Sequence, residues 1–278
     1  MSELGDRSSL FKAESVPDAY ERYVAGALFE PWAELLLDTA EVPEGASVLD
    51  IASGTGVVAR AAAGRVGHSG RIVASDFSAA MLARSEAVEL PVGSAPVEFV
   101  EASADALPFA DAAFDVVLCQ QGLQFFPAQQ LAVDEMRRVL RPGGVAGIAV
   151  WAHGHPLEPF GVYCEELVAV GAQSPFPRAF EADTYTMSVE AVRSLVEAAG
   201  FGSVTGGVVE LEVAWPDAAT AAAGVLGTPF VGALRELSAE QRERYDAAVL
   251  SRFTVGATGG PVRRQTAAVV VRASAPTT

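Results

Sequence analysis

The sequence predicts an α/β fold in which helices cover both faces of a mostly parallel β-sheet. Between residues 48 and 151, five apolar, strand-like runs alternate with helical segments, a pattern typical of parallel sheets with right-handed crossovers. The first run ends in a glycine-rich turn that opens a helix, as nucleotide-binding β-α-β units do. The chain has 278 residues, half of them apolar, which is enough for one large domain with a sizeable core.

The turn after the first strand is the most informative stretch. Asp50 closes the apolar run, and Gly54 and Gly56 allow a sharp turn against which a ligand can lie. The next strand, residues 71–76, ends at Asp76, twenty residues past Gly56. An acid at that place can accept hydrogen bonds from both ribose hydroxyls of an adenosine ligand. By itself the stretch also fits a turn without a ligand, or the loose dinucleotide fingerprint of a dehydrogenase.

The other elements follow from apolar periodicity and from breaks at glycine and proline. In chain order we expect a helix over 57–66, strands over 96–101 and 114–121, a helix over 128–140, a strand over 145–151, helices over 159–170 and 189–199, a strand over 204–215, a helical stretch over 218–250 that is broken near 227–229, and a last strand over 263–273.

Composition excludes several classes of function. The formal net charge is −16, which argues against nucleic acid and against an anionic membrane surface as partners. The two cysteines and three histidines show no metal-ligand spacing, so we expect no metal site and buried thiols. The first residues do not form a basic and apolar leader, and no apolar run is long enough to span a bilayer. These features predict a cytoplasmic protein.

Candidate ligand residues also flank the glycine-rich turn. Tyr20 and Tyr23 lie in a helical N-terminal region and combine an apolar body with a polar tip, so one of them is a candidate to reach a ligand. Gln120 and Gln121 lie at the carboxyl end of the fourth strand, where ligands bind in open α/β sheets. Trp151 ends the fifth strand at the same edge.

In four ordered motifs between residues 16 and 151, the chain resembles the class I S-adenosylmethionine-dependent methyltransferase family, in its ubiquinone-biosynthesis-like, small-molecule branch. Asp50, Gly54 and Gly56 match the first motif, with Ala52 where the family usually has a glycine. The others are Asp76 with the residues after it, the acid Asp105 before a small residue, and the Pro-Gly-Gly turn at 142–144. Three of these features do not belong to the dinucleotide fingerprint: the acid before the glycines, Asp105, and the Pro-Gly-Gly turn. They therefore favour a methyltransferase over a dehydrogenase.

The resemblance implies a Rossmann-like, doubly wound, seven-stranded sheet whose antiparallel last strand lies between the fifth and sixth. It further implies a helical lid over residues 14–42, a cofactor-binding core over 46–151, and substrate-side helical insertions and last strands over 152–278. The cofactor is expected to be S-adenosyl-L-methionine. Its expected contacts are Tyr23, Asp50, Ala52, Gly54, Gly56, Asp76, Phe77, Met81, Asp105, Ala106 and Gln120. Expected substrate contacts are Tyr20, Gln121, Phe125 and Trp151.

The predicted reaction is methyl transfer to an O, N or C nucleophile of a small molecule, by in-line displacement that depends mainly on positioning. If a base is needed, His153 and His155 are the candidates, because they follow the fifth strand beside the expected cleft. A partner subunit that binds the cofactor without turnover is the alternative, followed by an NAD-dependent dehydrogenase. The acceptor and the oligomeric state stay open.

Overall fold

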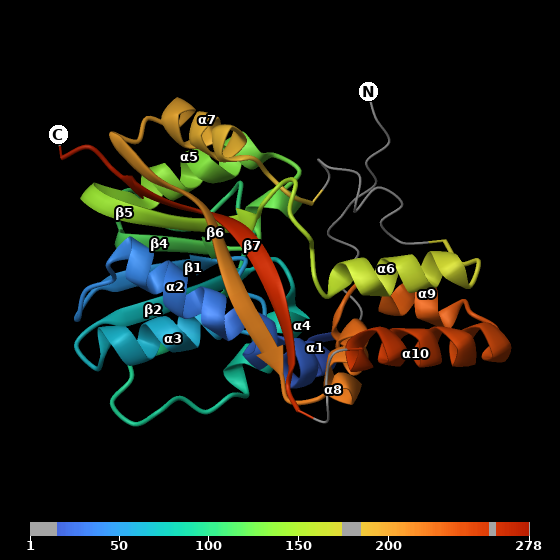
Figure 1. Ribbon diagram of the computed structural model, residues 1–278. Coiled ribbons are helices and arrows are strands. Elements are labelled where there is room, and N and C mark those ends of the chain that lie inside the picture. The colour runs from blue at the N-terminus through green and yellow to red at the C-terminus, as the bar shows by residue number, and fades with distance from the viewer. Residues whose placement is uncertain (1–15, 174–184, 256–259, 278) are drawn as a thin grey trace.

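The computed structural model describes residues 16–173, 185–255 and 260–277. Within them, seven strands form one sheet in the order β3-β2-β1-β4-β5-β7-β6 (Figure 1). The strands are β1 (Ser47–Ile51), β2 (Arg71–Asp76), β3 (Val97–Glu101), β4 (Phe114–Gln120), β5 (Leu140–Trp151), β6 (Ser203–Trp215) and β7 (Val262–Ser274). β7 runs antiparallel to both of its neighbours, whereas β1 to β5 are paired in parallel. The Rossmann-like sheet with its antiparallel last strand is therefore confirmed.

Helices cover both faces of the sheet, and each face has its own hydrophobic core. The sheet-covering helices are α2 (Glu30–Ala40), α3 (Val57–Val66), α4 (Ala79–Glu86), α5 (Gln129–Val139) and α7 (Val189–Ala198). In Figure 1, α5 and α7 lie above the sheet and α2 and α3 below it. α5 shows why such a segment folds as a helix on a sheet, because its buried residues Ala132, Val133, Met136 and Val139 recur at helical spacing.

The N-terminal region is one continuous helical rod of three segments, α1 (Val16–Tyr20), η2 (Glu21–Phe29) and α2. η2 is a π-helix of nine residues, a rare winding that is frequent at functional sites. Two ion pairs join this region to the helices after the first two strands. Glu21 lies 2.7 Å from Arg60 on α3, and Asp18 lies 2.8 Å from Arg84 on α4.

The C-terminal half adds a helical cap made of α6 (Phe160–Ala169), α8 (Ala218–Ala223), η4 (Gly224–Gly227), α9 (Val231–Arg235) and α10 (Ala239–Thr254). Most of it extends from one side of the sheet (Figure 1). The buried rings of Tyr163, Phe230 and Phe253 hold it together through edge-on contacts at 6.0–6.2 Å. The predicted break near residues 227–229 is present, between η4 and α9, and a second break at residues 236–238 separates α9 from α10. η4 packs directly on α1 at Gly227. A Cβ added to this glycine would lie only 2.5 Å from the Tyr20 Cα, so no larger residue fits there.

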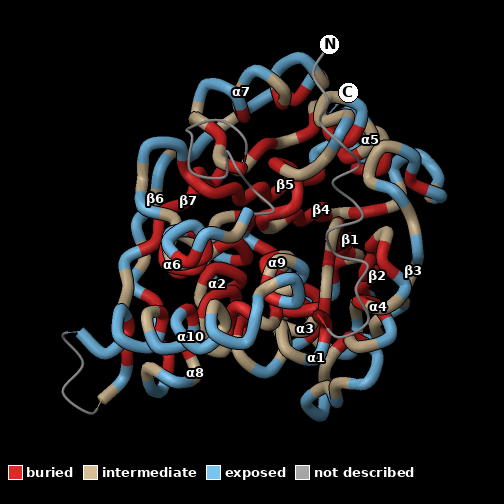
Figure 2. Tube along the Cα trace, turned by 90° about the vertical axis from the view of Figure 1, so that its right-hand side faces the viewer, coloured by how far each residue is buried: buried red, intermediate tan, exposed pale blue. Residues whose placement is uncertain are grey.

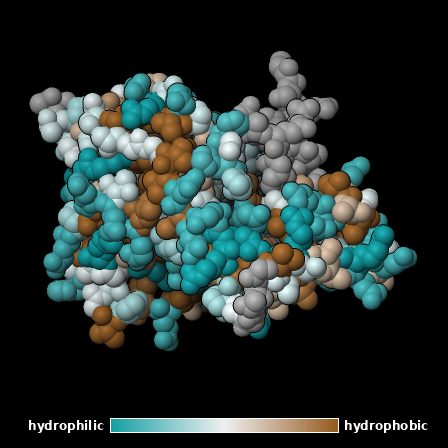
Figure 3. Space-filling model, viewed as in Figure 1, coloured by the Kyte–Doolittle hydropathy of each residue, from teal (hydrophilic) through white to brown (hydrophobic). Residues whose placement is uncertain are grey.

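Burial follows the layers. Buried residues gather in the sheet and α2, while much of α7, α10 and β6 is exposed (Figure 2). Hydrophilic side chains cover most of the face shown in Figure 3, in keeping with 35 acidic and 19 basic residues in the whole chain. Most element boundaries lie within one residue of the prediction, and the largest difference is at β5. β5 begins at Leu140 rather than at Val145, because Leu140 pairs with Phe114 across the Pro-Gly-Gly turn.

Candidate functional site

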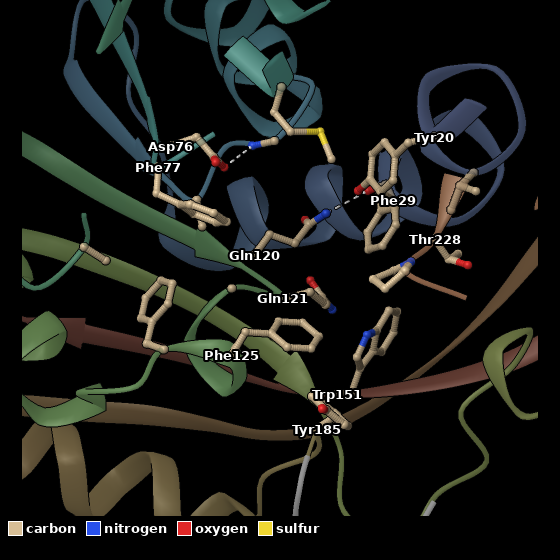
Figure 4. A pocket seen from close by; sticks show the side chains of 18 of the residues that line it. Tyr20, Phe29, Asp76, Phe77, Gln120, Gln121, Phe125, Trp151, Tyr185 and Thr228 are labelled. Carbon is tan, nitrogen blue, oxygen red and sulfur yellow. Dashed lines mark hydrogen bonds between the residues drawn. The ribbon is translucent and has the colours of Figure 1, made fainter. Parts of the chain in front are cut away.

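A cavity of about 410 Å³ lies at the carboxyl ends of the parallel strands, the edge at which open α/β sheets bind ligands. Asp76 and Phe77 lie toward one end of the cavity, and Trp151 and Tyr185 lie toward the other (Figure 4). We call the first end the acidic half; it is lined by Gly54, Asp76, Phe77, Met81 and residues 102–105. We call the second end the aromatic half; it is lined by Tyr20, Phe29, Phe125, Trp151, Phe160, Tyr185 and residues 227–230.

The turn after β1 lines the cavity through Ala52 and Gly54. Ala52, Gly54 and Gly56 all have left-handed backbone angles, with φ of +56°, +55° and +84°. The two glycines differ in what they face. A Cβ on Gly54 would meet nothing within 4 Å among the described residues, so this position opens into the cavity. A Cβ on Gly56 would lie 2.0 Å from the Ser85 Oγ, so Gly56 is required for packing of the turn on α4.

Asp76 ends β2 and holds the turn in place. Its carboxylate accepts a hydrogen bond from the backbone N–H of Gly54 at 2.9 Å (Figure 4). It accepts a second one from the backbone N–H of Ser78, also at 2.9 Å. Burial raises the pKa of Asp76, while these backbone donors favour its charged form. Asp76 lines the cavity, so its carboxylate combines a fixed position with access to a ligand.

Asp50 lies beneath the turn rather than in the cavity lining. It is 1% exposed, and its two carboxylate oxygens have no hydrogen-bond partner within the described part of the chain. Burial raises its pKa well above the usual range, and the nearby charge of Asp76 acts in the same direction. The Cys119 thiol is buried nearby. Its burial, together with the negative charge of Asp50, raises the pKa of this thiol to about 12.

Phe77, Met81 and Asp105 also line the acidic half. Phe77 follows Asp76, and Met81 lies one turn into α4, where Ser78 caps the helix by accepting from the Met81 N–H. In the loop after β3, the Ser103 hydroxyl donates to the Asp105 carboxylate, and both residues also line the cavity. An aromatic ring, a thioether and a carboxylate match the chemistry of a purine with an amino group.

The aromatic half is lined by rings from distant parts of the chain. Tyr20 stacks on Phe29 with ring centroids 5.2 Å apart, and Phe29 lies 6.1 Å from Trp151. Trp151 also contacts Phe160 edge-on at 6.3 Å, and Phe125 lies 5.3 Å from Tyr185. Burial raises the pKa of the Tyr20 hydroxyl well above its usual value, so this phenol stays neutral. The half is therefore mostly apolar, with few polar atoms.

Two adjacent glutamines lie at the junction of the halves (Figure 4). The Gln120 Nε2 donates to the backbone carbonyl of Phe29 at 3.1 Å and so ties β4 to the N-terminal helices. Gln121 has a left-handed backbone, with φ of +48°, and its N–H donates to the Ala149 carbonyl at 2.7 Å. Its side chain lies between Phe125 and Trp151 in Figure 4.

The structure brings eleven of the predicted site residues into one cavity lining: Tyr20, Ala52, Gly54, Asp76, Phe77, Met81, Asp105, Gln120, Gln121, Phe125 and Trp151. It places Tyr23, Asp50, Gly56, Ala106, His153 and His155 outside that lining. The Tyr23 ring packs under the Arg22 guanidinium, and its carbonyl accepts from the Trp215 indole at 3.0 Å. Ala106 is exposed next to the cavity.

The two histidines turn away after β5. The His153 N–H donates to the Met187 carbonyl at 3.0 Å, because Ala152 forms a β-bridge with Met187. Two residues later the His155 Nδ1 lies 3.6 Å from the carboxylate of Glu210, a residue of β6. Neither imidazole is part of the cavity lining.

Sequence reasoning missed several wall residues, above all Phe29, Phe160, Tyr185 and Phe230. In the sequence they lie in apolar stretches and are indistinguishable from core residues. Only the break at residues 227–229 gave a usable signal, because a glycine and a proline inside a helical stretch mark a loop. Within the described ranges, no helix is long and apolar enough to cross a membrane. The same residues contain no group of three or more His, Cys, Asp or Glu side chains arranged to hold a metal ion.

Comparisons with known proteins agree with this geometry. Residues 49–148 match a family described as a methyltransferase domain. A ubiquinone/menaquinone biosynthesis C-methyltransferase of Hahella chejuensis is 36% identical over 198 residues, which cover 65% of this chain and 78% of the relative. A 2-phytyl-1,4-naphtoquinone methyltransferase of Thermosynechococcus vestitus is 32% identical over 219 residues, covering 72% of this chain and 96% of the relative.

Solved structures share the fold at lower sequence identity. A putative methyltransferase from Bacillus halodurans superposes with a TM-score of 0.55 at 19% identity, covering 88% of this chain and 98% of the other. Phosphoethanolamine N-methyltransferase 2 of Haemonchus contortus, solved in complex with S-adenosyl-L-methionine, has a TM-score of 0.59 at 18% identity and covers 98% of this chain and 60% of its own. Together with the sequence relatives, the matched domain and the ligand-binding edge, these findings show that the chain belongs to the class I S-adenosylmethionine-dependent methyltransferases, enzymes whose methyl donor is S-adenosyl-L-methionine.

Proposed function

We propose that this enzyme methylates a small molecule with an apolar body, which binds in the aromatic half while the methyl donor binds in the acidic half. The observation that carries the proposal is the division of one cavity into two ends of different chemistry. One end has a carboxylate at the glycine-rich turn, and the other has aromatic walls. We also infer a division along the chain, with residues 14–42 as the lid, 46–151 as the cofactor-binding core and 152–278 as substrate-side helices and last strands; of these, residues 14–15, 174–184, 256–259 and 278 lie outside the described ranges.

The residues of the acidic half fit S-adenosyl-L-methionine. Gly54 leaves free the space that a Cβ would fill, so the ligand can lie against the turn. Asp76 would accept from the ribose hydroxyls, Phe77 and Met81 would hold the adenine, and Asp105 would accept from its amino group. Asp50 is buried beneath the turn and outside the cavity lining, so we assign it no direct contact with the donor. When bound, the donor supplies a methyl group already activated on a sulfonium.

Catalysis by this chain is proposed to rest on positioning. Within the described lining, the titratable groups are Tyr20, Asp76, Asp105 and Tyr185, and both carboxylates lie in the half assigned to the donor. No histidine, lysine or cysteine belongs to that lining. The aromatic walls would fix the acceptor against the methyl and exclude water, and holding two reactants in a near-attack geometry can lower the barrier by about 7–11 kcal/mol.

The relatives support an acceptor with an apolar body. Two of them are named as a C-methyltransferase of ubiquinone and menaquinone biosynthesis and as a 2-phytyl-1,4-naphtoquinone methyltransferase. Rings and long hydrocarbon groups of that kind suit a wall of phenylalanine, tyrosine and tryptophan. The methylated atom of this enzyme's own acceptor, whether O, N or C, is left to experiment.

The test combines donor binding with turnover. Calorimetry should show binding of S-adenosyl-L-methionine, and a panel of apolar phenols, amines and quinols should yield S-adenosylhomocysteine with at least one acceptor. With that acceptor, His153→Asn and His155→Asn should each keep kcat within a few-fold and retain the acidic limb of the pH profile. A loss of 10²–10⁴ in kcat with a flattened limb would instead identify a histidine base and contradict the positioning account. Binding of the donor without turnover for any acceptor would contradict the proposed division of the cavity.

A further inference from the structure

The backbone at Gln121 is fixed in an unusual conformation. Its φ of +48° is left-handed, and Ala52, which also lines the cavity, has φ of +56°. Non-glycine residues held in this region cost about 1–3 kcal/mol each and cluster at functional sites. The neighbouring Gly122 permits the arrangement, because a Cβ there would lie 2.7 Å from the Ala52 Cβ. The Gln121 N–H, bonded to Ala149 at 2.7 Å, holds the conformation, so the direction of the side chain is set by two strands.

The carboxamide of Gln121 has no partner in the part of the chain that the structure describes. The residue is 7% exposed, and both its Nε2 and its Oε1 are buried without a hydrogen bond. Its neighbour Gln120 is half paired: its Nε2 donates to the Phe29 carbonyl, and only its Oε1 has no partner among the described residues. Buried amides are nearly always paired in proteins, so an amide with both groups free and facing a cavity implies a ligand that pairs with it.

The walls around this amide supply little else that is polar. Phe125 lies to one side of it and Trp151 to the other in Figure 4, and Phe29 and Phe160 both contact Trp151. A flat ring would be held by these faces through stacking and edge contacts. Such contacts do not distinguish an acceptor that carries an oxygen from a hydrocarbon of the same shape. Only a directed donor and acceptor can do so.

We propose that Gln121 is the specificity-determining residue of the acceptor site: its carboxamide binds a hydroxyl or carbonyl oxygen of a flat, otherwise apolar acceptor. This inference rests on the assignment of the aromatic half to the acceptor. A hydroxyl donates to the Gln121 Oε1 or accepts from its Nε2, and a carbonyl accepts from the Nε2. An apolar molecule that fills the site leaves the amide unpaired, and the penalty of a buried, unpaired polar group corresponds to about a 5- to 150-fold loss of affinity.

The experiment uses two probes of the same shape, 2-naphthol and 2-methylnaphthalene, with the chain saturated with S-adenosylhomocysteine at pH 7. Ligand-observed NMR titrations give both dissociation constants for the natural chain, Gln121→Met and Gln121→Gly. Methionine keeps the length of the side chain without an amide. Glycine tolerates the left-handed φ, so this second variant tests the proposal even if the first folds poorly. The affinity for S-adenosylhomocysteine, measured by calorimetry, shows whether the donor site is intact.

The natural chain should bind 2-naphthol about 5- to 150-fold more tightly than 2-methylnaphthalene. In both variants the ratio should fall to about 1 or below, with the affinity for S-adenosylhomocysteine unchanged. An equal preference in the natural chain, a preference that survives both substitutions, or failure of both probes to bind would overturn the inference while leaving donor binding in place. Failure of the natural chain to bind S-adenosylhomocysteine would instead refute the proposed function itself.

Discussion

The two glycines of the turn after β1 give opposite expectations for one added methyl group. Gly54→Ala places a left-handed alanine at φ of +55°, which costs about 1–2 kcal/mol of stability. For a chain of 278 residues, each kcal/mol lowers Tm by about 2 °C, so the expected loss is about 2–4 °C. The methyl meets no described atom within 4 Å and instead enters the space assigned to the donor. Overpacking of that kind costs typically 1–3 kcal/mol, or about 5- to 150-fold in Kd.

Gly56→Ala is the matched comparison. It has the same left-handed strain, but its methyl would lie 2.0 Å from the Oγ and 3.1 Å from the Cβ of Ser85, which is 3% exposed. The added 1–3 kcal/mol of overpacking should bring the loss in Tm to about 4–10 °C. Adding Ser85→Ala should restore part of it, because the closest atom is removed.

Thermal unfolding and calorimetry with S-adenosylhomocysteine separate the two effects. The affinity should fall in Gly54→Ala and stay near that of the natural chain in folded Gly56→Ala. If both substitutions lower the affinity equally at equal stability, or if only Gly56→Ala lowers it, the assignment of Gly54 as the donor's contact is refuted.

Three further predictions concern the same region. Asp76→Asn should weaken S-adenosylhomocysteine by about 1.5–3 kcal/mol, the scale of charge-assisted hydrogen bonds, and unchanged calorimetric affinity in the folded variant would contradict the role of this carboxylate. Burial raises the pKa of Cys119 to about 12, so its thiolate population at pH 8 is roughly a thousandfold below that of a free thiol. Mass spectrometry should therefore find iodoacetamide adducts at Cys119 only after unfolding. Labelling of the folded chain at the rate of a free cysteine would contradict its burial. Trypsin cleavage after Arg22 should slow when S-adenosylhomocysteine binds and accelerate in Glu21→Gln, which loses the ion pair to Arg60; equal cleavage under all three conditions would count against a lid.

The sheet was predictable because its information is local. Short apolar runs between glycine and proline turns specify strands, and α3 and β2 begin and end where the sequence places them, at residues 57–66 and 71–76. The antiparallel position of β7 was not evident from periodicity and came from the family resemblance. Its pairing with β5 and β6 joins residues far apart in the chain.

The cavity lining was predictable for residues at the carboxyl ends of parallel strands, as for Asp76 and Gln121. It was not predictable where distant partners decide the direction of a side chain. Nothing near Gly56 in the sequence points to Ser85, and nothing near His153 points to the Met187 strand partner that turns the chain outward. Tyr20 lines the cavity and Tyr23 does not. Tyr23 lies in the π-helix, whose turn contains more residues than that of an α-helix, so α-helical spacing does not predict which way its side chain points.

The most direct test of this account is a crystal structure of the chain with S-adenosylhomocysteine. We expect the ribose oxygens within hydrogen-bond distance of the Asp76 carboxylate, the backbone of Gly54 against the ligand, and the thioether sulfur facing the aromatic half beside Gln121. A ligand bound elsewhere, or one whose sulfur points away from the aromatic half toward Asp105, would contradict the account.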